Sequence, residues 1–563
     1  MSHFEPSLFR QQFPLISNNQ VNTKTQRPII YFDNAATSQK PDCVFKALSD
    51  FYLNQNANVH RGSHLLSATA TKQFEKAREI VQKHINAKQY NEIIWTKGAT
   101  EAINLVANSW GLTQLNPADE IVISYAEHHA NIVPWQMVAE RTGAKLKVLP
   151  LNKFGCIDEH QLEKIIGKNT RLVCVTHISN VIGKINPLEK IIARAKMVGA
   201  LTLIDGAQAV AHCDIDVQAL DCDFYVFSAH KVYSSMGIGV LYGKACYLNT
   251  MPPYQLGGEM IKKVSIEKST FNQLPFKFEA GTPDVAGAIA LAQALTFLQK
   301  YKQGINAFEQ QLMQYAYSQL SAIDAVNLIV DGCPNIPLFS FTLTNHHNQD
   351  VASYLDNKGI AVRSGHHCAM PLMDYLSIDG CVRVSLSAYN SFAEIDYFIK
   401  CLEEILYDKN SDEKSLTLSS TTIEEKDVFF SRHDVVKLFS SIKSWDARHR
   451  QIMLLGKELD RLAVEKRTQD NLIQGCESLA WLDAKQNEQG VFYFSADSEA
   501  KIIRGLLVIV LSAFNHKTAE QILSFDIETF FKQLNLMQHL SPSRGNGVKA
   551  IVDKIKAIAE KAS

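Results

Sequence analysis

Short apolar runs alternate with amphipathic stretches through the first half of the chain. Four of these runs have the length and composition of buried strands: EIIW at 92–95, EIVIS at 120–124, RLVCVTH at 171–177 and LTLID at 201–205. Between the last two runs, PLEKIIARAKMVGA at 187–200 repeats its apolar residues with the spacing of a helix. This alternation predicts an α/β fold with a mostly parallel sheet that is covered on both faces.

The pattern changes further along the chain and divides it into parts. Residues 1–304 form a predicted large domain, whose N-terminal segment contributes to a smaller one, and residues 305–406 mix strands and helices as a small α+β domain would. Residues 407–427 are rich in Ser, Thr, Glu and Lys and predict an interdomain linker. Helical spacing in WDARHRQIMLLGKELDRLA and alternation in GVFYFSADS predict a separate α/β domain over residues 428–563.

Composition narrows the class of protein. A chain of 563 residues is too long for one core, and its formal net charge of −1 argues against a protein that coats nucleic acid or a membrane surface. The run LLVIVL at 506–511 is far shorter than the roughly 20 residues that span a bilayer, so it predicts a core element. The N-terminus shows no secretory pattern, and the 11 cysteines form no CxxC pair, so we expect a cytoplasmic protein in which Cys174 and most other thiols are packing residues.

The first chemical signal joins two segments of the large domain. Asp205 ends a predicted strand, where α/β sheets bind ligands, and Lys231 follows Ser-x-His in SAHKVYSSMGIGVLYG. Taken alone, such an aspartate is more often a helix cap and such a lysine is usually solvated. Together they supply the Schiff-base lysine and the partner of the pyridine nitrogen that pyridoxal phosphate needs. Thr100, in TKGATEA before a predicted helix, adds donors for a phosphate.

The segment RSGHHCAMP leaves the role of Cys368 open. The thiol could be a metal ligand with His366 and His367, a buried packing group or a nucleophile on an exposed loop. A metal site is disfavoured, because structural zinc ligands usually come as pairs separated by two to four residues. We expect the two histidines to shape the loop and to lower the pKa of Cys368.

Eight motifs, in this order, resemble the Suf-type (class II) cysteine desulfurases, which are pyridoxal phosphate enzymes of fold type I. They are YFDNAATSQKP, NVHRGSHLLS, EHHANIVPWQ, HISNVIG, DGAQAV, SAHKVYSSMGIGVLYG, FEAGTPD and RSGHHCAMPLM. The resemblance covers residues 5–406 and implies a large domain with a parallel or mixed sheet plus a small α+β domain.

The resemblance also implies roles for individual residues. Around the cofactor, Lys231 would form the Schiff base, Asp205 would pair with the pyridine nitrogen, Gln208 would contact the phenolic oxygen, His128 would stack on the ring, and Thr100, Ser228 and His230 would hold the phosphate. Thr282 would reach the phosphate of a second subunit, which implies a homodimer. The substrate set would be Arg383, Arg363, Asn180, His60 and Arg61, with Arg383 clamping the carboxylate of L-cysteine.

The implied reaction converts L-cysteine to L-alanine. Lys231 would remove the α-proton and His128 would carry the proton of the substrate thiol. Cys368 would attack the substrate sulfur as a thiolate, since the thiol is a weak nucleophile, and would end as a persulfide.

The C-terminal domain carries a second candidate thiol, Cys476, in IQGCESLAWL. Alone, this cysteine could be a packed thiol. Residues 430–560, however, resemble SufE/CsdE-type sulfur acceptors in a separate α/β domain, although a proline-rich stretch of that family is missing. The resemblance implies that Cys476 takes sulfur from Cys368. Arg544 matches a family arginine to which we assign no step.

Several alternatives stay open at this level. A selenocysteine lyase would use the same residues, a plain aminotransferase would not need Cys368, and a non-enzymatic sulfur-relay scaffold would have no use for Lys231. The expected recipient of the sulfur is a Suf-type scaffold for iron–sulfur cluster assembly, with thiolation of tRNA or of cofactors as the other outcome. We expect no metal, nucleic-acid or membrane partner.

Overall fold

The computed structural model describes most of the chain, and its contacts form two units. The described residues are 4–17, 21, 27–415, 430–440, 442, 445–475, 478–534, 536 and 542–562. The first unit consists of residues 1–20, 29–342 and 360–399, and the second of residues 21–28, 343–359 and 400–563. None of the helices in these described ranges is both long and apolar enough to cross a bilayer.

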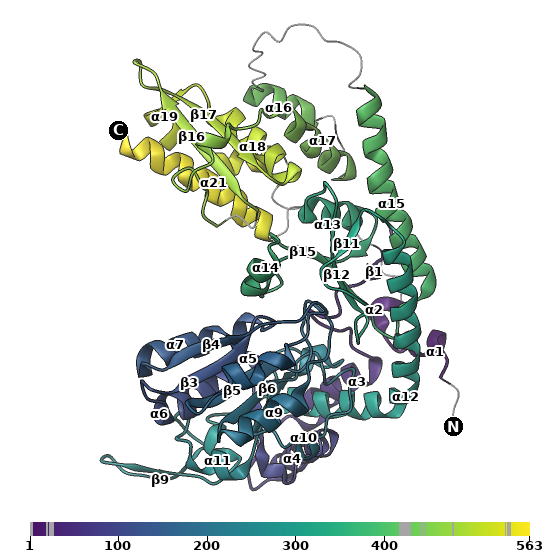
Figure 1. The fold of residues 1–563 in the computed structure, drawn as a ribbon, viewed down its shortest axis with the longest axis vertical. Coiled ribbons are helices and arrows are strands. Elements are labelled where there is room, and N and C mark those ends of the chain that lie inside the picture. Colours follow the sequence, from purple (N-terminus) through teal and green to yellow (C-terminus); the bar gives the residue numbers. More distant parts are fainter. Residues whose placement is uncertain are drawn as a thin grey trace. The chain divides into compact units, whose positions relative to one another are not determined.

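A seven-stranded sheet forms the centre of the first unit (Figure 1). Its strands, in spatial order, are β2 (Ile93–Thr96), β8 (Gly239–Gly243), β7 (Phe224–Ser228), β6 (Leu201–Asp205), β5 (Thr170–Thr176), β3 (Glu120–Ser124) and β4 (Lys145–Leu149). β8 pairs antiparallel with both β2 and β7, and the other pairings in this sheet are parallel, so the sheet is mixed but mostly parallel, as the apolar runs predict.

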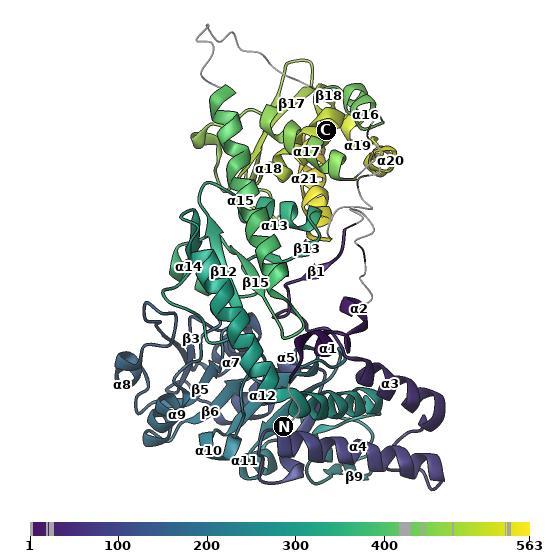
Figure 2. The same cartoon turned by 90° about the vertical axis from the view of Figure 1, so that its right-hand side faces the viewer.

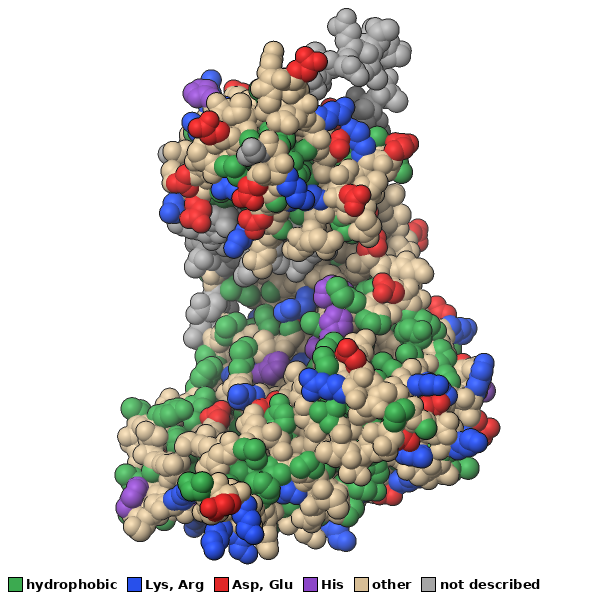
Figure 3. Space-filling model, turned by 90° about the vertical axis from the view of Figure 1, so that its left-hand side faces the viewer, with side chains coloured by type: hydrophobic (Ala, Val, Ile, Leu, Met, Phe, Trp, Pro, Cys, Tyr) green, Lys and Arg blue, Asp and Glu red, His purple; other side chains and the backbone are tan. Residues whose placement is uncertain are grey.

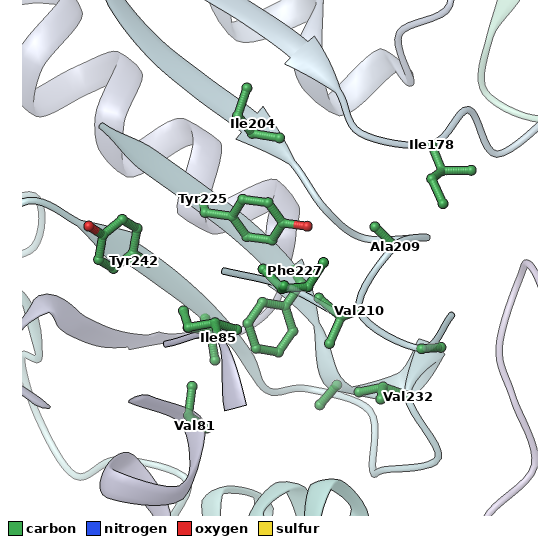
Figure 4. Packing of buried hydrophobic residues seen from close by; sticks show 14 of the residues in the cluster. Val81, Ile85, Ile178, Ile204, Ala209, Val210, Tyr225, Phe227, Val232 and Tyr242 are labelled. Carbon is green, nitrogen blue, oxygen red and sulfur yellow. The ribbon is translucent and has the colours of Figure 1, made fainter. Parts of the chain in front are cut away.

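Both faces of this sheet are buried, and successive residues of a strand serve opposite faces. In β7, Tyr225 and Phe227 point to one core, and Phe224 and Val226 point to the other. Helices α4 (Leu65–His84), α9 (Leu188–Met197) and the first part of α12 (Val285–Ser321) cover the first face, whereas α5 (Ala99–Val106) and α7 (Val133–Thr142) cover the second. Figure 4 shows Tyr225 and Phe227 among side chains that include Val81 and Ile85 at the end of α4. Cys174 is fully buried in the second core, which confirms it as a packing residue.

A smaller four-stranded sheet follows the large one. Its order is β11 (Val326–Leu328), β12 (Leu338–Leu343), β15 (Cys381–Ser385) and β14 (Arg363–Gly365). Helix α12 packs against α3 (Asp42–Asp50) and α4 and then continues to β11 (Figure 2). The N-terminal strand β1 (Ile30–Tyr31) pairs in parallel with β13 (Ile360–Ala361), and α14 (Met370–Leu376) follows β14. The loop between β14 and α14 carries Cys368.

The second unit has its own core around one buried helix. Helix α18 (Lys501–Phe514), which contains LLVIVL, is buried on all sides from Ile502 onward, and this confirms the run as a core element. It packs against α16 (Arg432–Ser440), α17 (Trp445–Glu458), α21 (Pro542–Lys561) and strand β17. Strands β16 (Ala480–Gln486), β17 (Val491–Ser498) and β18 (Lys517–Thr518) form an antiparallel sheet, and α13 (Asn348–Asn357), α19 (Ala519–Leu523) and α20 (Ile527–Gln533) complete the unit.

A helix continues into the first part of the predicted linker. Helix α15 (Phe392–Ser415) extends nine residues into the range 407–427. The part of the linker that this helix covers contains Lys, Glu and Asp residues and no Gly or Pro. The helix can therefore continue although the composition is polar. The rest of the predicted linker, residues 416–427, lies outside the described residues.

Candidate active site

The carboxyl ends of β5, β6 and β7 open into one cavity of about 310 Å³. This is the edge at which α/β sheets bind ligands. The cavity brings together most of the predicted site residues, namely Thr100, His128, Asn180, Asp205, Gln208, Ser228, His230, Lys231, Arg363, Cys368 and Arg383. A group of histidine side chains is visible on this face of the first unit (Figure 3).

Asp205 and Lys231 face the cavity from neighbouring strands. Asp205 ends β6, and its Oδ1 accepts a hydrogen bond of 2.9 Å from the backbone N–H of Ala207, which orients the carboxylate. Lys231 lies in the turn that follows β7. Burial raises the pKa of Asp205 and lowers the pKa of Lys231 to about 8, while the attraction between the two groups acts against both shifts. An amine with such a pKa is partly neutral near pH 8 and can act as a nucleophile or base.

One end of the cavity has the features of a phosphate site. Gly98 caps α5, and a Cβ placed on Gly239 would lie 2.4 Å from the Cα of Gly98, so the backbones approach closely here. Ser228 Oγ accepts a hydrogen bond of 2.8 Å from the N–H of Ala99, and Nδ1 of His230 is buried without a partner. Backbone N–H groups at a helix start together with an unpaired imidazole nitrogen suit a phosphate.

His128 is held as a neutral ring with a known tautomer. Its Nδ1 accepts a hydrogen bond of 3.0 Å from the backbone N–H of Ala130, so the proton resides on Nε2. Burial, reinforced by Lys231, lowers the pKa of His128 to about 4. A neutral ring is suited to stack on an aromatic cofactor. On the other side of the cavity, Gln208 Nε2 donates to Ala35 O at 2.8 Å, which fixes its amide.

Two arginines that differ in exposure also line the cavity. Arg363 and Arg383 are direct cross-strand neighbours on β14 and β15, and like charges in this position repel. Asp33 lies between them: it accepts from Nε and Nη2 of Arg363 at 3.1 and 2.8 Å, and from Nη2 of Arg383 at 3.1 Å. The Arg363 side chain is 50% exposed and that of Arg383 is 3% exposed.

One nitrogen of Arg383 has no hydrogen-bond partner among the described residues. Its Nη1 donates to Asn180 O at 2.9 Å, whereas its Nε is buried and has no partner. A carboxylate that enters the cavity can therefore bind the Nε edge of Arg383. The fork of Arg363 is already taken by Asp33, so the two predicted substrate arginines differ in what they can offer.

Cys368 is exposed and lines the cavity, which contradicts a buried thiol. In the described residues, no group of three His, Cys, Asp or Glu side chains could hold a metal ion. His366 Nδ1 accepts from the N–H of Cys368 at 3.2 Å, and His367 Nε2 lies 3.1 Å from Cys381 O, so the two rings serve different partners. This geometry favours the nucleophile among the three readings of RSGHHCAMP. The expected lowering of the Cys368 pKa stays a prediction.

Some predicted site residues lie elsewhere. Thr282 is exposed and does not line the cavity. His60 is paired with Glu75 at 2.9 Å and Arg61 with Glu259 at 2.7 Å, and neither His60 nor Arg61 lines the cavity of this chain. Long-range packing, which local sequence does not reveal, decides these positions.

Cys476 lies outside the described residues, and so does the side chain of Arg544. The segments that flank Cys476 are well held. The N–H of Ile473 donates to Ala480 O at 2.8 Å, and Lys554 Nζ donates to Leu472 O at 2.8 Å. On the other side, Ser498 Oγ donates to Leu479 O at 2.8 Å.

The sequence reasoning missed Asp33, Glu127 and His129. Asp33 and Glu127 stand inside quoted motifs, YFDNAATSQKP and EHHANIVPWQ, which was the only available signal. Glu127 is fully buried next to the cavity floor and accepts from the N–H of Thr176 at 3.0 Å and from Asn131 Nδ2 at 2.6 Å. Burial raises the pKa of Glu127 to about 8.

These features fit pyridoxal phosphate. A buried lysine and a strand-end aspartate face each other, a neutral imidazole faces the same cavity, and unpaired buried donors or acceptors remain on His230 and Arg383. Lys231 would hold the cofactor, Asp205 its ring nitrogen, and Ser228, His230 and the start of α5 its phosphate.

Comparisons with known proteins agree with this assignment. Residues 30–398 match the family described as Aminotransferase class-V, and residues 433–559 match the Fe-S metabolism associated domain, SufE. A probable cysteine desulfurase of Vibrio cholerae is 48% identical over 70% of this chain and 97% of its own length. A cysteine desulfurase of Escherichia coli is 47% identical over 71% of this chain and 98% of its own length.

Solved structures show the same likeness. The cysteine desulfurase CsdA of Escherichia coli has 38% identity and a TM-score of 0.67, and covers 72% of this chain and 99% of its own. The apo cysteine desulfurase of Thermococcus onnurineus NA1 has 37% identity and a TM-score of 0.68, and covers 72% of this chain and 100% of its own. The chain therefore belongs to the pyridoxal-phosphate-dependent cysteine desulfurases of the class-V aminotransferase family, and it carries a SufE domain at its C-terminal side.

Proposed function

We propose that this protein moves the sulfur of L-cysteine first to Cys368 and then to Cys476 of the fused SufE domain, and releases L-alanine. The observation that supports the first transfer most directly is that the exposed Cys368 shares one cavity with Lys231 and the buried Arg383. A nucleophile, a base and a carboxylate-binding group then act on one small substrate.

Arg383 binds the substrate carboxylate in this proposal. Its Nη1 and Nη2 donate to Asn180 O and Asp33, so the guanidinium is already oriented before substrate arrives, and its buried Nε has no partner among the described residues. Arg363, whose fork is held by Asp33, is half exposed and lies nearer the solvent.

Proton movements are assigned to Lys231 and His128. Bound pyridoxal phosphate supplies an electron sink for the α-carbon of the substrate. Neutral Lys231, whose pKa burial lowers to about 8, takes the α-proton. His128 presents Nε2–H toward the cavity, because its Nδ1 is occupied by the N–H of Ala130, so it can donate a hydrogen bond there but needs a proton exchange before it accepts one.

Sulfur transfer balances as one displacement. The Cys368 thiolate attacks the substrate sulfur, an S–S bond forms, and the Cβ–S bond of the substrate breaks with its electron pair remaining on the carbon side. The substrate carbon takes up a proton, so the products are L-alanine and the Cys368 persulfide. L-Cysteine and one thiol thus become L-alanine and one persulfide, with no external oxidant.

The second transfer would place this sulfur on Cys476. The match to SufE over residues 433–559 and the firmly held segments on both sides of Cys476 support an acceptor loop. Because Cys368 and Cys476 belong to one chain, the effective concentration of one thiol at the other reaches about the millimolar range. We further propose a homodimer, with Thr282 contributing to the phosphate site of the second copy, and a scaffold for iron–sulfur cluster assembly as recipient. The cytoplasmic location stays a prediction.

Mass spectrometry of the holoenzyme after addition of L-cysteine tests the relay. We expect a gain of one sulfur atom on Cys368 and on Cys476, and we expect the Cys368→Ala variant to lose both gains together with alanine formation. Cys246→Ala, which removes another exposed thiol, serves as the matched control and should change neither gain. A gain on Cys476 that persists in Cys368→Ala would contradict the proposed order.

The same enzyme preparation separates a desulfurase from a selenocysteine lyase. We expect alanine release from L-cysteine at a rate comparable with that from L-selenocysteine, because Cys368 supplies a thiolate nucleophile in the cavity. Release from selenocysteine alone would replace the desulfurase proposal with the lyase.

A further inference from the structure

Each of the motifs EHHAN and RSGHHC contains two adjacent histidines, and only one histidine of each pair lines the cavity. These are His128 and His367. The other two, His129 and His366, meet each other outside it. Their rings stack with centroids 5.7 Å apart and planes inclined by 30°. The reaction described above gives this second pair no role.

The loop that carries Cys368 is conformationally costly. His367 and Cys368 both have a left-handed backbone, with φ of 53° and 56°. For residues with a Cβ this conformation costs on the order of 1–3 kcal/mol each and persists only where the surroundings hold it. The question is therefore which contacts hold this loop.

Two backbone N–H groups of the loop donate hydrogen bonds to imidazole nitrogens. The N–H of Met370 donates to His129 Nε2 at 3.0 Å, and the N–H of Cys368 donates to His366 Nδ1 at 3.2 Å. In addition, the N–H of His129 donates to Cys368 O at 2.7 Å. His129 thus holds the backbone on both sides of Ala369, by its main chain and by its ring.

Two further contacts hold the residue before the cysteine. Asn180 Nδ2 donates to His367 O at 2.9 Å, and His367 Nε2 contacts Cys381 O at 3.1 Å. Asn180, which lines the cavity, and Cys381 therefore fix the residue before the cysteine. In the part of the chain that the structure describes, the contacts of His129 connect Cys368 and Met370 to the turn that positions His128.

We propose that His129 is a positioning residue for sulfur transfer, whose Nε2 lone pair holds the backbone of residues 368–370 so that Cys368 faces the cavity, with His366 as the ring that supports it. The proposal rests on the proposed role of Cys368 as the nucleophile. It requires His129 to be neutral with its proton on Nδ1. Burial and the neighbouring His366 lower the pKa of His129, which favours that form.

Three substitutions in the full-length holoenzyme test this role. His129→Phe keeps a stacking ring and removes the lone pair, and His129→Gln restores an acceptor at about the position of Nε2. His160→Gln is the matched control, because His160 is an exposed histidine in another 3₁₀ turn. Since His129 is only partly buried, we expect all three proteins to fold. His129→Leu replaces His129→Phe if thermal unfolding shows otherwise.

The expected result is a selective loss of turnover. In His129→Phe, kcat for alanine formation falls about tenfold, as the loss of one hydrogen bond in a strained loop implies, while KM and the visible spectrum of the bound cofactor stay unchanged. His129→Gln recovers to within about threefold of the wild-type chain, and His160→Gln matches it. A kcat of His129→Phe equal to wild type, or no recovery in His129→Gln, overturns the positioning role.

A second measurement separates this proposal from the proposed function. Alkylation of Cys368 by iodoacetamide, followed by mass spectrometry, needs no turnover. The positioning role of His129 predicts equal alkylation rates in wild type and His129→Gln. It predicts a rate at least about threefold higher in His129→Phe, because the loop is released. Equal rates in all three proteins overturn the positioning role. Absence of alanine formation in the wild-type chain instead overturns the proposed function and leaves this alkylation result to decide the positioning role.

Discussion

The two ends of the cavity are built in opposite ways. At the cofactor end, Asp205, Gln208 and Ser228 are buried at or just after the ends of strands, and the large sheet fixes their positions. At the sulfur end, Cys368 is exposed and stands on a left-handed turn between β14 and α14, where hydrogen bonds rather than packing hold it. The polar residues of the first end are buried in the large sheet, whereas the thiol of the second end is exposed on a loop that hydrogen bonds hold.

The difference follows from what each end must do. Stabilising charge in a reaction needs groups that are oriented in advance and removed from water, and strand ends provide this. A sulfur carrier must meet its substrate inside the cavity and must later present the same sulfur to a second thiol. An exposed loop allows both encounters, and contacts with His129, His366 and Asn180 hold its left-handed backbone in place. The predictions below change one end at a time.

The largest effect is expected from Lys231→Ala at the cofactor end. Because Lys231 is both the anchor of the cofactor and the proposed base, alanine formation should fall by about 10³-fold or more, and the visible band of lysine-bound cofactor should disappear. Absorbance spectra and an alanine assay measure this. Lys190→Ala, at a lysine that is 65% exposed, is the control and should behave as wild type. Persistent turnover in Lys231→Ala would contradict the assignment.

A smaller loss is expected from Asp205→Asn. The amide keeps the shape and can still accept from the N–H of Ala207, but it loses the charge that we propose to pair with the ring nitrogen of the cofactor. Losing one charge-assisted hydrogen bond in a buried site should lower kcat by about 100-fold. Steady-state kinetics at saturating cofactor tests this, and a loss below about threefold would show that the charge of Asp205 is not used.

At the sulfur end, substitution of the two arginines should raise KM for L-cysteine by different factors. Arg383→Lys removes a buried fork and should raise KM for L-cysteine about 30-fold, whereas Arg363→Lys should raise it only about threefold, because its side chain is half exposed and bound to Asp33. Steady-state kinetics of the two variants measures the ratio. Equal increases would mean that both arginines bind the carboxylate directly, and that Asp33 gives way when substrate enters.

Local sequence patterns pointed to Asp205 and Lys231 at the cofactor end, whereas the roles of Gln208 and His128 came from the family resemblance. Apolar runs such as LTLID predict the buried strand, and a polar residue at its carboxyl end, Asp205, must then face the ligand edge of the sheet. The covered faces of the sheet and the buried helix that contains LLVIVL follow from the same periodicity. Both depend on residues that are close together in sequence.

Local patterns could not predict the sulfur end in full. Asp33 stands between Arg363 and Arg383, about 330 and 350 positions further along the chain, and the contact exists only after β14 pairs with β15. The link from His129 to Met370 spans 241 positions. No spacing rule connects such residues. The helix that replaces the first part of the predicted linker was missed because polar composition does not exclude helix.

The smallest effect concerns the pH dependence of cofactor loading. Only a neutral amine can attack the aldehyde of pyridoxal phosphate, and burial lowers the pKa of Lys231 to about 8 from the 10.5 of a solvated lysine. Its neutral fraction therefore rises about tenfold between pH 7 and pH 9 and then levels off, whereas an exposed lysine would rise about 100-fold and continue upward. Stopped-flow absorbance of the apoenzyme mixed with cofactor should show the tenfold profile.

Asp205→Asn sharpens this last prediction. The carboxylate of Asp205 raises the pKa of Lys231 against the effect of burial, so the neutral form of the lysine should appear at lower pH once the charge is removed. The loading profile of the variant should therefore shift toward acid and level off at a lower pH than that of the wild-type chain. A profile that does not move would mean that the charge of Asp205 does not affect the pKa of Lys231, and would contradict the pairing of these two side chains at the cofactor end.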